Sequence, residues 1–379
     1  MIRLTLLSSL RSQRITEEGS VLTIDTKPPM QTQHTLSLFA GAHAPLVVCD
    51  GMGVDSTAML AGMHQRKIRP DLIIHADVGA EREATYEYHA IKRDWLKRVG
   101  FPDLTVVRYQ PKNFKHWPHY HTIEENILTN VSLPSIAYGG HTCSAKWKIA
   151  PINTHVLGWT PAQECWSAGG KVLKAIGFED SPHEQRRACK GSATFALQAD
   201  ESSRYELWFP LQQWGWNRER CSLEILRAGL PVPPKSSCYF CTAMKPWEVE
   251  ELSEDKLKRI VILEARTAQR HLDHARAKAE QAGERWDGKP RTEGLWRKAV
   301  KGMRGATPKP GSMTQYIREK RLLPAEEVDR LISSTPTHTF TRDDFAQMGI
   351  TNWQEWIQRI TTTPAQEGSV LTIDTPTSA

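Results

Sequence analysis

The chain has 379 residues, of which 39% are hydrophobic and 24% are charged, and these values are ordinary for a soluble globular protein. No apolar run approaches the roughly 20 residues that a membrane-spanning helix needs, so the sequence excludes such a helix. The formal net charge of +6 suits an anionic partner such as a nucleotide or a nucleic acid, and it equally suits an ordinary balanced surface.

The first elements in the chain are a polar tail and a series of short apolar runs. Residues 1–43 are polar and predict a disordered tail. Buried strands are expected at residues 45–49, 72–76, 104–108 and 172–177, with helical spacing at residues 57–66 and 83–99. Strands that alternate with helices indicate an α/β fold, in which a parallel twisted sheet is flanked by helices.

The second half of the chain reads differently. A polar, charged stretch at residues 179–203 carries no clear element, and a long charge-rich helix is expected from Pro246 to about Ala282, ending at Gly283. A basic segment rich in glycine and proline follows at residues 287–311. The last 70 residues or so predict a small helical appendage, with a minor core made by Phe345, Trp353 and Trp356.

The octapeptide GSVLTIDT occurs twice, at residues 19–26 and at residues 368–375. Two copies do not make a repeat architecture. A duplicated coding segment explains the pair, and no physical property of the octapeptide points to a function.

A loop with the sequence GMGVDS follows the first predicted strand and precedes a helix. Gly51 and Gly53 lack side chains, so backbone N–H groups in this loop can approach an anion closely. Ser56 stands at the start of the helix, where unpaired N–H groups and the helix dipole favour negative charge. Asp55 either caps the helix or orients the loop and a magnesium ion. An ordinary glycine turn is the alternative, but the strand–loop–helix context favours phosphate binding.

This loop resembles the PP-loop (SGGxDS) of the adenine-nucleotide α-hydrolase superfamily. GMGVDSTAML is most similar to the GGGVDSTAML form of phosphoadenosine phosphosulfate reductase-like proteins, many of them carried by phages and prophages. Gly51 stands where the wider superfamily has serine, and Met52 stands where it has glycine.

Four further motifs follow in the order that the family has. Residues 76–86 resemble ADTGxE…TY, and residues 143–151 resemble CTxxFKIxP, with Lys148 at the position of the lysine. Residues 176–187 resemble IGxxxxExxR with altered spacing. Residues 209–245 follow PLxxWGWxRxxC…GLPVPxKSxCxFCPxxK, with Thr242 in place of proline. The resemblance covers roughly residues 45–250, and the five ordered motifs together are specific.

The resemblance implies a site for ATP, or a related adenine nucleotide, with magnesium. Asp77 is expected at the carboxyl edge of the sheet, where ligands bind in open α/β folds; otherwise it caps the next helix. The residues implied in binding are Gly51, Gly53, Val54, Asp55, Ser56, Asp77 and Gly177, and those implied in catalysis are Asp55, Asp77 and Lys148.

Seven cysteines form no regular framework, and the sequence lacks an export signal. We therefore expect a reducing cytoplasm, the host's if a phage encodes the protein, where paired cysteines bind metal more often than they form disulfides. Four thiolates, from Cys143, Cys221, Cys238 and Cys241, suit a 4Fe-4S cluster or a structural zinc ion. The alternative for the C-x-x-C pair is two buried cysteines. In the DNA-sulfuration branch of the family, cysteines at these positions are associated with an iron–sulfur cluster.

The other three cysteines, Cys49, Cys165 and Cys189, have no partner by pattern and are expected to be ordinary residues. Two charged features are also open to two interpretations. The basic stretch from Lys256 to Arg321 is interleaved with aromatic residues and suits contact with DNA or RNA, although a solvated helix face is the commoner meaning. The histidines at 116, 119 and 121 suit a metal, or a polar loop that faces a substrate, which we favour.

The leading functional hypothesis is an ATP pyrophosphatase that adenylates a substrate, with sulfur transfer to a nucleic acid as its further extension. One alternative is a genuine phosphoadenosine phosphosulfate reductase, and another is a non-catalytic accessory protein of phage origin that binds nucleotide or nucleic acid. The expected domains are a tail at residues 1–43, a PP-loop nucleotide-binding domain at 44–250, a basic helical extension at 251–335, and a small helical segment with a tail at 336–379.

Overall fold

The computed structural model describes residues 44–114, 116–134, 136–137, 140–194, 203–290, 292–296 and 310–362, without the side chains of residues 136, 137, 140, 141 and 189–194. The predicted tail and both copies of GSVLTIDT lie outside these residues. The described elements are, in chain order, β1 (Leu46–Cys49), α2 (Val54–Gln65), β2 (Leu72–Ala76), α3 (Glu83–Arg98), β3 (Leu104–Val107), α4 (Ile123–Asn130), β4 (Ile136–Ala137), β5 (Gly140–His141), α5 (Thr142–Ser144), η2 (Ala145–Ile149), α6 (Ala150–Leu157), α7 (Thr160–Ser167), β6 (Val172–Ile176), α8 (Pro182–Thr194), β7 (Tyr205–Trp208), α10 (Pro210–Gln213), α11 (Arg218–Arg227), α12 (Pro246–Glu250), α13 (Glu254–Ala282), α14 (Met313–Glu319), α15 (Ala325–Ser333), α16 (Arg342–Met348) and α17 (Trp353–Thr362).

A five-stranded parallel sheet with the order β3-β2-β1-β6-β7 organises the first half of the chain. Val47 in the central strand is opposite Leu72 of β2 on one side and Lys174 of β6 on the other. The chain therefore adds β2 and β3 on one side of β1, and it later returns to add β6 and β7 on the other side. This topology confirms the predicted α/β fold, and it places the change of winding direction between β1 and β6.

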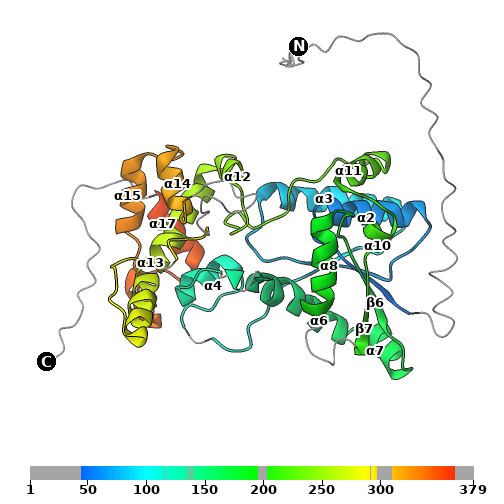
Figure 1. Ribbon diagram of the computed structural model, residues 1–379, viewed down its shortest axis with the longest axis horizontal. Coiled ribbons are helices and arrows are strands. Elements are labelled where there is room, and N and C mark those ends of the chain that lie inside the picture. Colours follow the sequence, from blue (N-terminus) through cyan, green and yellow to red (C-terminus); the bar gives the residue numbers. More distant parts are fainter. Residues whose placement is uncertain are drawn as a thin grey trace, which may run out of the picture. The chain divides into compact units, whose positions relative to one another are not determined.

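Alternate residues of the central strand face opposite layers of helices. Leu46 and Val48 belong to a core that includes buried side chains of α2, α3 and α11. Val47 belongs to a different core, which it shares with Val156 of α6 and Ala162 of α7. Figure 1 shows these helices on the two sides of the sheet. Both faces of a parallel sheet are normally covered in this way, which explains why its strands are almost uniformly apolar.

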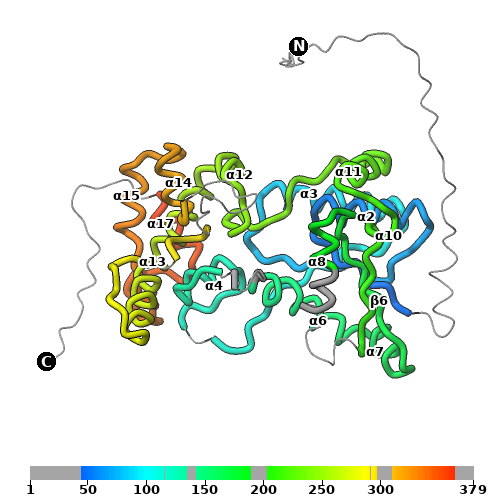
Figure 2. The backbone as a smooth tube through the Cα atoms, viewed as in Figure 1, coloured from blue at the N-terminus to red at the C-terminus, as the bar shows by residue number. Residues whose placement is uncertain are grey.

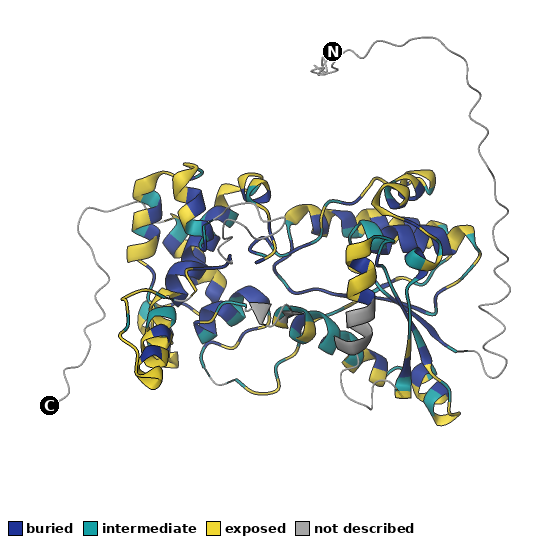
Figure 3. Cartoon of the chain, viewed as in Figure 1, coloured by how far each residue is buried: buried dark blue, intermediate teal, exposed yellow. Residues whose placement is uncertain are grey.

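A separate core joins the C-terminal helices to the segment that follows β2. Helix α13 contributes several of its buried residues, and the predicted core residues Phe345, Trp353 and Trp356 all belong to it. Val78 and Ala80, which come shortly after β2, are part of the same core, and Figure 3 shows the buried residues of these helices in dark blue. The segments that we separated at residues 250 and 335 thus share one core.

Several elements differ from the sequence prediction. The helix expected from Pro246 to Ala282 is interrupted, because Ser253 is extended (φ −64°, ψ 156°) between α12 and α13. The polar stretch at residues 179–203 contains helix α8, which Figure 2 labels, and the next described element is β7. Helix α13 ends at Gly283 in the left-handed conformation (φ 67°), as predicted. No helix among the described residues is long and apolar enough to span a membrane.

Candidate functional site

The predicted phosphate loop leaves the carboxyl end of β1, beside the point where the winding of the sheet changes direction. In open α/β sheets this is where ligands bind. Gly177 follows β6 at the same edge, and a Cβ atom placed on it would lie 2.8 Å from Ser56 N and 2.9 Å from the carbonyl carbon of Asp55. The end of β6 therefore lies directly against the first turn of α2, and only glycine fits there.

The loop has an open side and a packed side. Gly51 is exposed, and no atom lies within 4 Å of a Cβ placed on it. Gly53 lies against the segment that carries Ser236, because a Cβ atom placed on Gly53 would lie 3.0 Å from the Ser236 hydroxyl oxygen. Met52 is fully buried and adopts the left-handed conformation with φ 60°, and helix α2 begins at Val54. The open side at Gly51 provides room for an anion next to the helix N-terminus.

A buried ion pair that the sequence did not reveal lies beneath the loop. Asp50 accepts hydrogen bonds from Lys92 Nζ (2.8 Å to each carboxylate oxygen), from Met52 N (2.7 Å) and from the Ser56 hydroxyl (2.7 Å). Burial opposes the negative charge, but Lys92 and Ser56 outweigh it and hold the pKa of Asp50 below its usual range. The carboxylate is thus ionised, and both of its oxygens accept hydrogen bonds from groups of the protein.

Asp55 brings three of the sequence motifs together. Its carboxylate pairs with Arg218 of α11 at 2.9 Å, and the same guanidinium lies 3.3 Å from Glu179. Burial raises the pKa of Asp55 to about 6, although the charge of Arg218 acts against that rise and Glu179 adds to it. Neither Arg218 nor Glu179 was named from the sequence, and their places in the tryptophan-rich and IGFEDS motifs were the available signal.

Asp77 is held at the carboxyl end of β2. It accepts hydrogen bonds from Gly79 N (2.8 Å) and the Tyr86 hydroxyl (2.9 Å) on one oxygen, and from Arg108 Nε (3.0 Å) and Nη2 (2.6 Å) on the other. Burial opposes the charge, but these donors together lower the pKa of Asp77. Asp77 is therefore an ionised carboxylate at the expected edge, and it orients the half-exposed Arg108.

Lys148 is paired with a glutamate that we did not single out. Lys148 belongs to the short π-helical turn η2, and its Nζ lies 3.0 Å from Glu81 Oε1. The other oxygen of Glu81 is buried and has no hydrogen-bond partner among the described residues. Burial lowers the pKa of Lys148, but Glu81 and Cys238 outweigh that effect and raise it overall. Lys148 is thus a charged lysine beside thiols rather than beside the phosphate loop's own carboxylates.

The structure does not bring the four predicted metal-ligating cysteines together. Cys143, Cys238 and Cys241 pack against the core of the C-terminal helices. Cys221 lies in the core under α2 and α11, where its thiol contacts the carbonyl of Trp216 and burial raises its pKa to about 12. No three His, Cys, Asp or Glu side chains are placed to hold a metal ion in the part of the chain that is described. The predicted four-cysteine centre does not fit, because the packing of α11 on α2 takes Cys221 into another core.

Three cysteines and the histidine-rich loop after β3 remain among the residues that the sequence analysis considered. Cys165 is buried and Cys49 is partly buried, while the side chain of Cys189 lies outside the described residues. In the loop after β3, His119 is exposed and stacks on Phe114, with ring centroids 3.9 Å apart.

The basic stretch from Lys256 to Arg321 is partly engaged within the protein. Lys258 pairs with Glu254 (2.8 Å), and Arg259 pairs with Glu124 (3.0 Å). Trp296 and Tyr316 belong to the core, so these two rings are not free to stack on bases. Residues 297–309, which carry further basic residues, lie outside the described chain.

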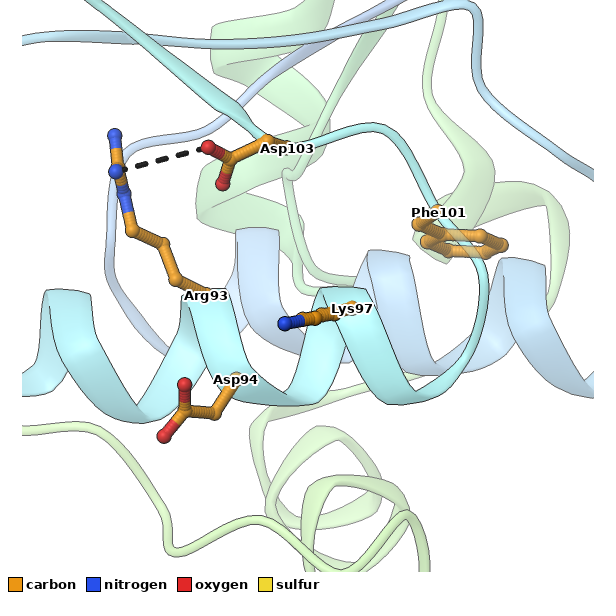
Figure 4. A pocket seen from close by; sticks show the side chains of 5 residues that line it. All are labelled: Arg93, Asp94, Lys97, Phe101 and Asp103. Carbon is orange, nitrogen blue, oxygen red and sulfur yellow. Dashed lines mark ion pairs between the residues drawn. The ribbon is translucent and has the colours of Figure 1, made fainter.

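One surface pocket lies at the opposite edge of the sheet. It is lined by Arg93, Asp94, Lys97, Phe101 and Asp103, from the C-terminal end of α3 and the turn before β3. Figure 4 shows Arg93 and Asp103 paired across it at 3.6 Å. Because the pocket faces the amino ends of the strands, it is separate from the loop edge and is not the candidate site.

Comparison with known proteins adds one finding. Among solved structures, the chain is similar to a phosphoadenylyl-sulfate (PAPS) reductase from Candida auris in a phosphate complex, with 18% identity over 53% of this chain and 81% of that one. The TM-score is 0.30, so the fold assignment rests on the strand order and not on this likeness. No family model matches the chain, and no curated protein matches it.

Proposed function

We propose that this protein is a PP-loop enzyme that binds ATP at residues 51–56 and splits it between the α and β phosphates to adenylate a substrate. The observation that carries the proposal is the position of the loop. It lies at the carboxyl edge of the sheet, where the winding direction changes between the paired strands β1 and β6, with an open side at Gly51 and the end of β6 against its helix. Five motifs that resemble one family in the same order support the choice of nucleotide.

The residues at this edge have distinct proposed roles. The N–H groups of the first turn of α2 have no partners within the helix, so they would hold phosphate oxygens. Asp55 is the carboxylate of the loop, and carboxylate and phosphate oxygens are the ligands that magnesium prefers. Bound there, the ion would neutralise phosphate charge. Asp77 would position Arg108 toward the ligand.

Sulfur transfer is the finer part of the proposal. The segment that carries Cys238 and Cys241 also carries Ser236, which contacts Gly53 of the loop. Cys238 forms an antiparallel bridge with Glu81, so the thiols and Lys148 are attached to the same edge as the nucleotide loop. This proximity supports sulfur delivery at this edge: sulfide-level sulfur from an external donor would attack the adenylated carbon, so that a C–S bond forms as the bond from that carbon to the AMP oxygen breaks.

The test is the formation of AMP and pyrophosphate from ATP with magnesium, measured with candidate nucleic acids as acceptors. We expect the Asp55→Ala variant to lose at least about 100-fold of this activity, because stabilisation of phosphate charge by a magnesium ion contributes several kcal/mol and this variant would lack the proposed ligand. Asp94→Ala is the matched control, since Asp94 is exposed on α3 beside the pocket of Figure 4. Equal turnover by the wild type and Asp55→Ala would reject the proposal, as would ADP and phosphate as the products.

The same assay separates the alternatives. Resemblance to the genuine reductases implies a nucleophilic cysteine in an ECGLH-like segment near the C-terminus, and residues 242–379 contain no cysteine. We therefore expect no sulfite when the protein receives the sulfonucleotide and thioredoxin. A non-catalytic accessory protein would bind ATP and form neither product.

A further inference from the structure

The ion pair between Asp50 and Lys92 is not part of the loop motif, yet it touches the loop at two points. Asp50 extends β1, with its N–H donating to Ile74 O at 2.8 Å. Its carboxylate then reaches Met52 N and the Ser56 hydroxyl, both at 2.7 Å. Lys92 comes from α3, on the face of the sheet that α2 also covers. One carboxylate thus connects a strand, two helices and the loop.

Stability does not account for this pair. The side chain of Asp50 is 0% exposed and that of Lys92 is 1% exposed. Two charges lose their hydration when they are buried, and well-packed apolar residues in their place are often as stable or more so. The burial of these two charges is better explained by the hydrogen bonds that Asp50 accepts from the loop.

We infer that Asp50 is a positioning residue for the phosphate loop and that Lys92 neutralises it; for the identity of the ligand, this inference rests on the proposed function. The bond from Met52 N turns that residue inward and holds it at φ 60°. The hydroxyl proton of Ser56 is already donated to Asp50, so the serine meets a ligand with its lone pairs. Phosphate oxygens must then be bound by backbone N–H groups at the start of α2.

The charge of Lys92 makes this arrangement compatible with an anionic ligand. An unpaired carboxylate so close to the loop would repel phosphate strongly in a buried setting. Lys92 binds both oxygens of Asp50 at 2.8 Å, so the pair is neutral as a whole. The oxygen atoms of Asp50 therefore accept hydrogen bonds from the loop, while the charge of Lys92 reduces the repulsion between Asp50 and an anionic ligand.

Two double variants separate the acceptor from the charge. Asp50→Asn with Lys92→Met is neutral and keeps an oxygen that accepts from Met52 N and Ser56, whereas Asp50→Val with Lys92→Met is neutral and lacks it. We measure amide hydrogen exchange over residues 49–63 in the ligand-free protein, and the Kd for ATP with magnesium. In the Val variant, both the rate of amide exchange in the loop and the Kd for ATP should rise about tenfold or more above the wild type. This is the factor expected when one hydrogen bond to a charged group is lost. The Asn variant should remain within a few-fold of the wild type.

A third variant controls for the loss of a buried ion pair in itself. Arg259→Met leaves Glu124, which is buried in the C-terminal core, without its guanidinium. It should lower stability without changing exchange in the loop. Equal loop exchange in the Val and Asn variants would overturn the inference, and so would a rise spread evenly along α2. The exchange experiment needs no ligand. If the wild type failed to bind ATP, the proposed function would be rejected, and loop exchange in the variants would still test the positioning role of Asp50.

Discussion

Met52 combines an unfavourable backbone conformation with complete burial of its side chain. It stands where the PP-loop superfamily has glycine, and it adopts a positive φ of 60°. For a residue with a side chain, this conformation costs about 1–2 kcal/mol. Complete burial of a methionine side chain contributes about 1.5–3 kcal/mol in return, and Met52 is 0% exposed. Packing of the methionine side chain therefore offsets the cost of the positive φ.

Asp55 gives a pH dependence that separates function from folding. Burial raises its pKa from 3.8 to about 6, so the carboxylate that faces the loop is protonated in mildly acidic solution. We expect kcat/KM for pyrophosphate release to fall about tenfold per pH unit below pH 6. The residual activity of Asp55→Asn should lack this acidic limb.

The contribution of Asp55 to folding stability changes with pH in the opposite direction to its contribution to activity. Because the pKa of Asp55 is higher in the folded than in the unfolded state, its contribution to stability is fully present below about pH 4 and is lost as the pH rises through about 6. Thermal unfolding measured beside activity from pH 5 to 8 should therefore show no loss of stability from Asp55 where activity falls. A parallel loss of both that persists in Asp55→Asn would assign the acidic limb to unfolding.

At the scale of elements, apolar strands were predictable and polar ones were not. The runs at β1, β2, β3 and β6 were all identified, because strands covered on both faces are nearly continuous in apolar residues. The strand β7 (YELW) is at the edge of the sheet, and Glu206 within it is exposed. Its signal is short and mixed. Helix α8 is rich in charged residues, so it has no apolar stripe that would distinguish it from a loop.

Two glycines at the loop predict opposite outcomes for the same substitution. Gly177→Ala places a Cβ 2.8 Å from Ser56 N, whereas Gly51→Ala meets nothing within 4 Å. We expect Gly177→Ala to lower the free energy of unfolding by about 1–3 kcal/mol, the range for overpacking. Gly51→Ala should fold normally and lose ATP affinity, because its methyl group occupies the open side of the loop. Denaturant titration and a nucleotide-binding titration measure both. If Gly51→Ala bound ATP as the wild type does, phosphate would not approach the loop from this side.

At the scale of the whole molecule, the motifs predicted which residues meet at the carboxyl edge of the sheet, but they did not predict the long-range ion pairs around those residues. The motifs predicted that the loop, Asp77 and Gly177 would meet at one edge, and the strand order brings them there. The pairing of Asp50 with Lys92 links residues 42 positions apart, and that of Asp55 with Arg218 links residues 163 apart. Local patterns contain no information about such partners. Cys221 was misplaced for the same reason, since a shared motif does not imply a shared core.

Arg266 is the clearest case of a long-range partner that holds distant parts of the chain together. Its guanidinium is completely buried, donates to Leu128 O at 2.6 Å and Pro336 O at 2.5 Å, and lies 4.3 Å from the ring centroid of Phe340 and 5.0 Å from that of Trp353. Among the described residues it has no acidic partner. It therefore joins α4, α13 and the C-terminal segment through carbonyls and aromatic faces alone.

This environment predicts that the conservative substitution at Arg266 is the more harmful one. Arg266→Lys keeps a buried charge but loses the planar fork that reaches two carbonyls and stacks on rings, so the free energy of unfolding should fall by about 2–4 kcal/mol. Arg266→Met removes the charge at similar volume and should cost less. Urea unfolding followed by tryptophan fluorescence measures the difference, and ATP affinity should be unchanged in both variants, because the loop lies in another core. A less stable Met variant would show that the two carbonyl bonds outweigh the penalty of burying an unpaired guanidinium.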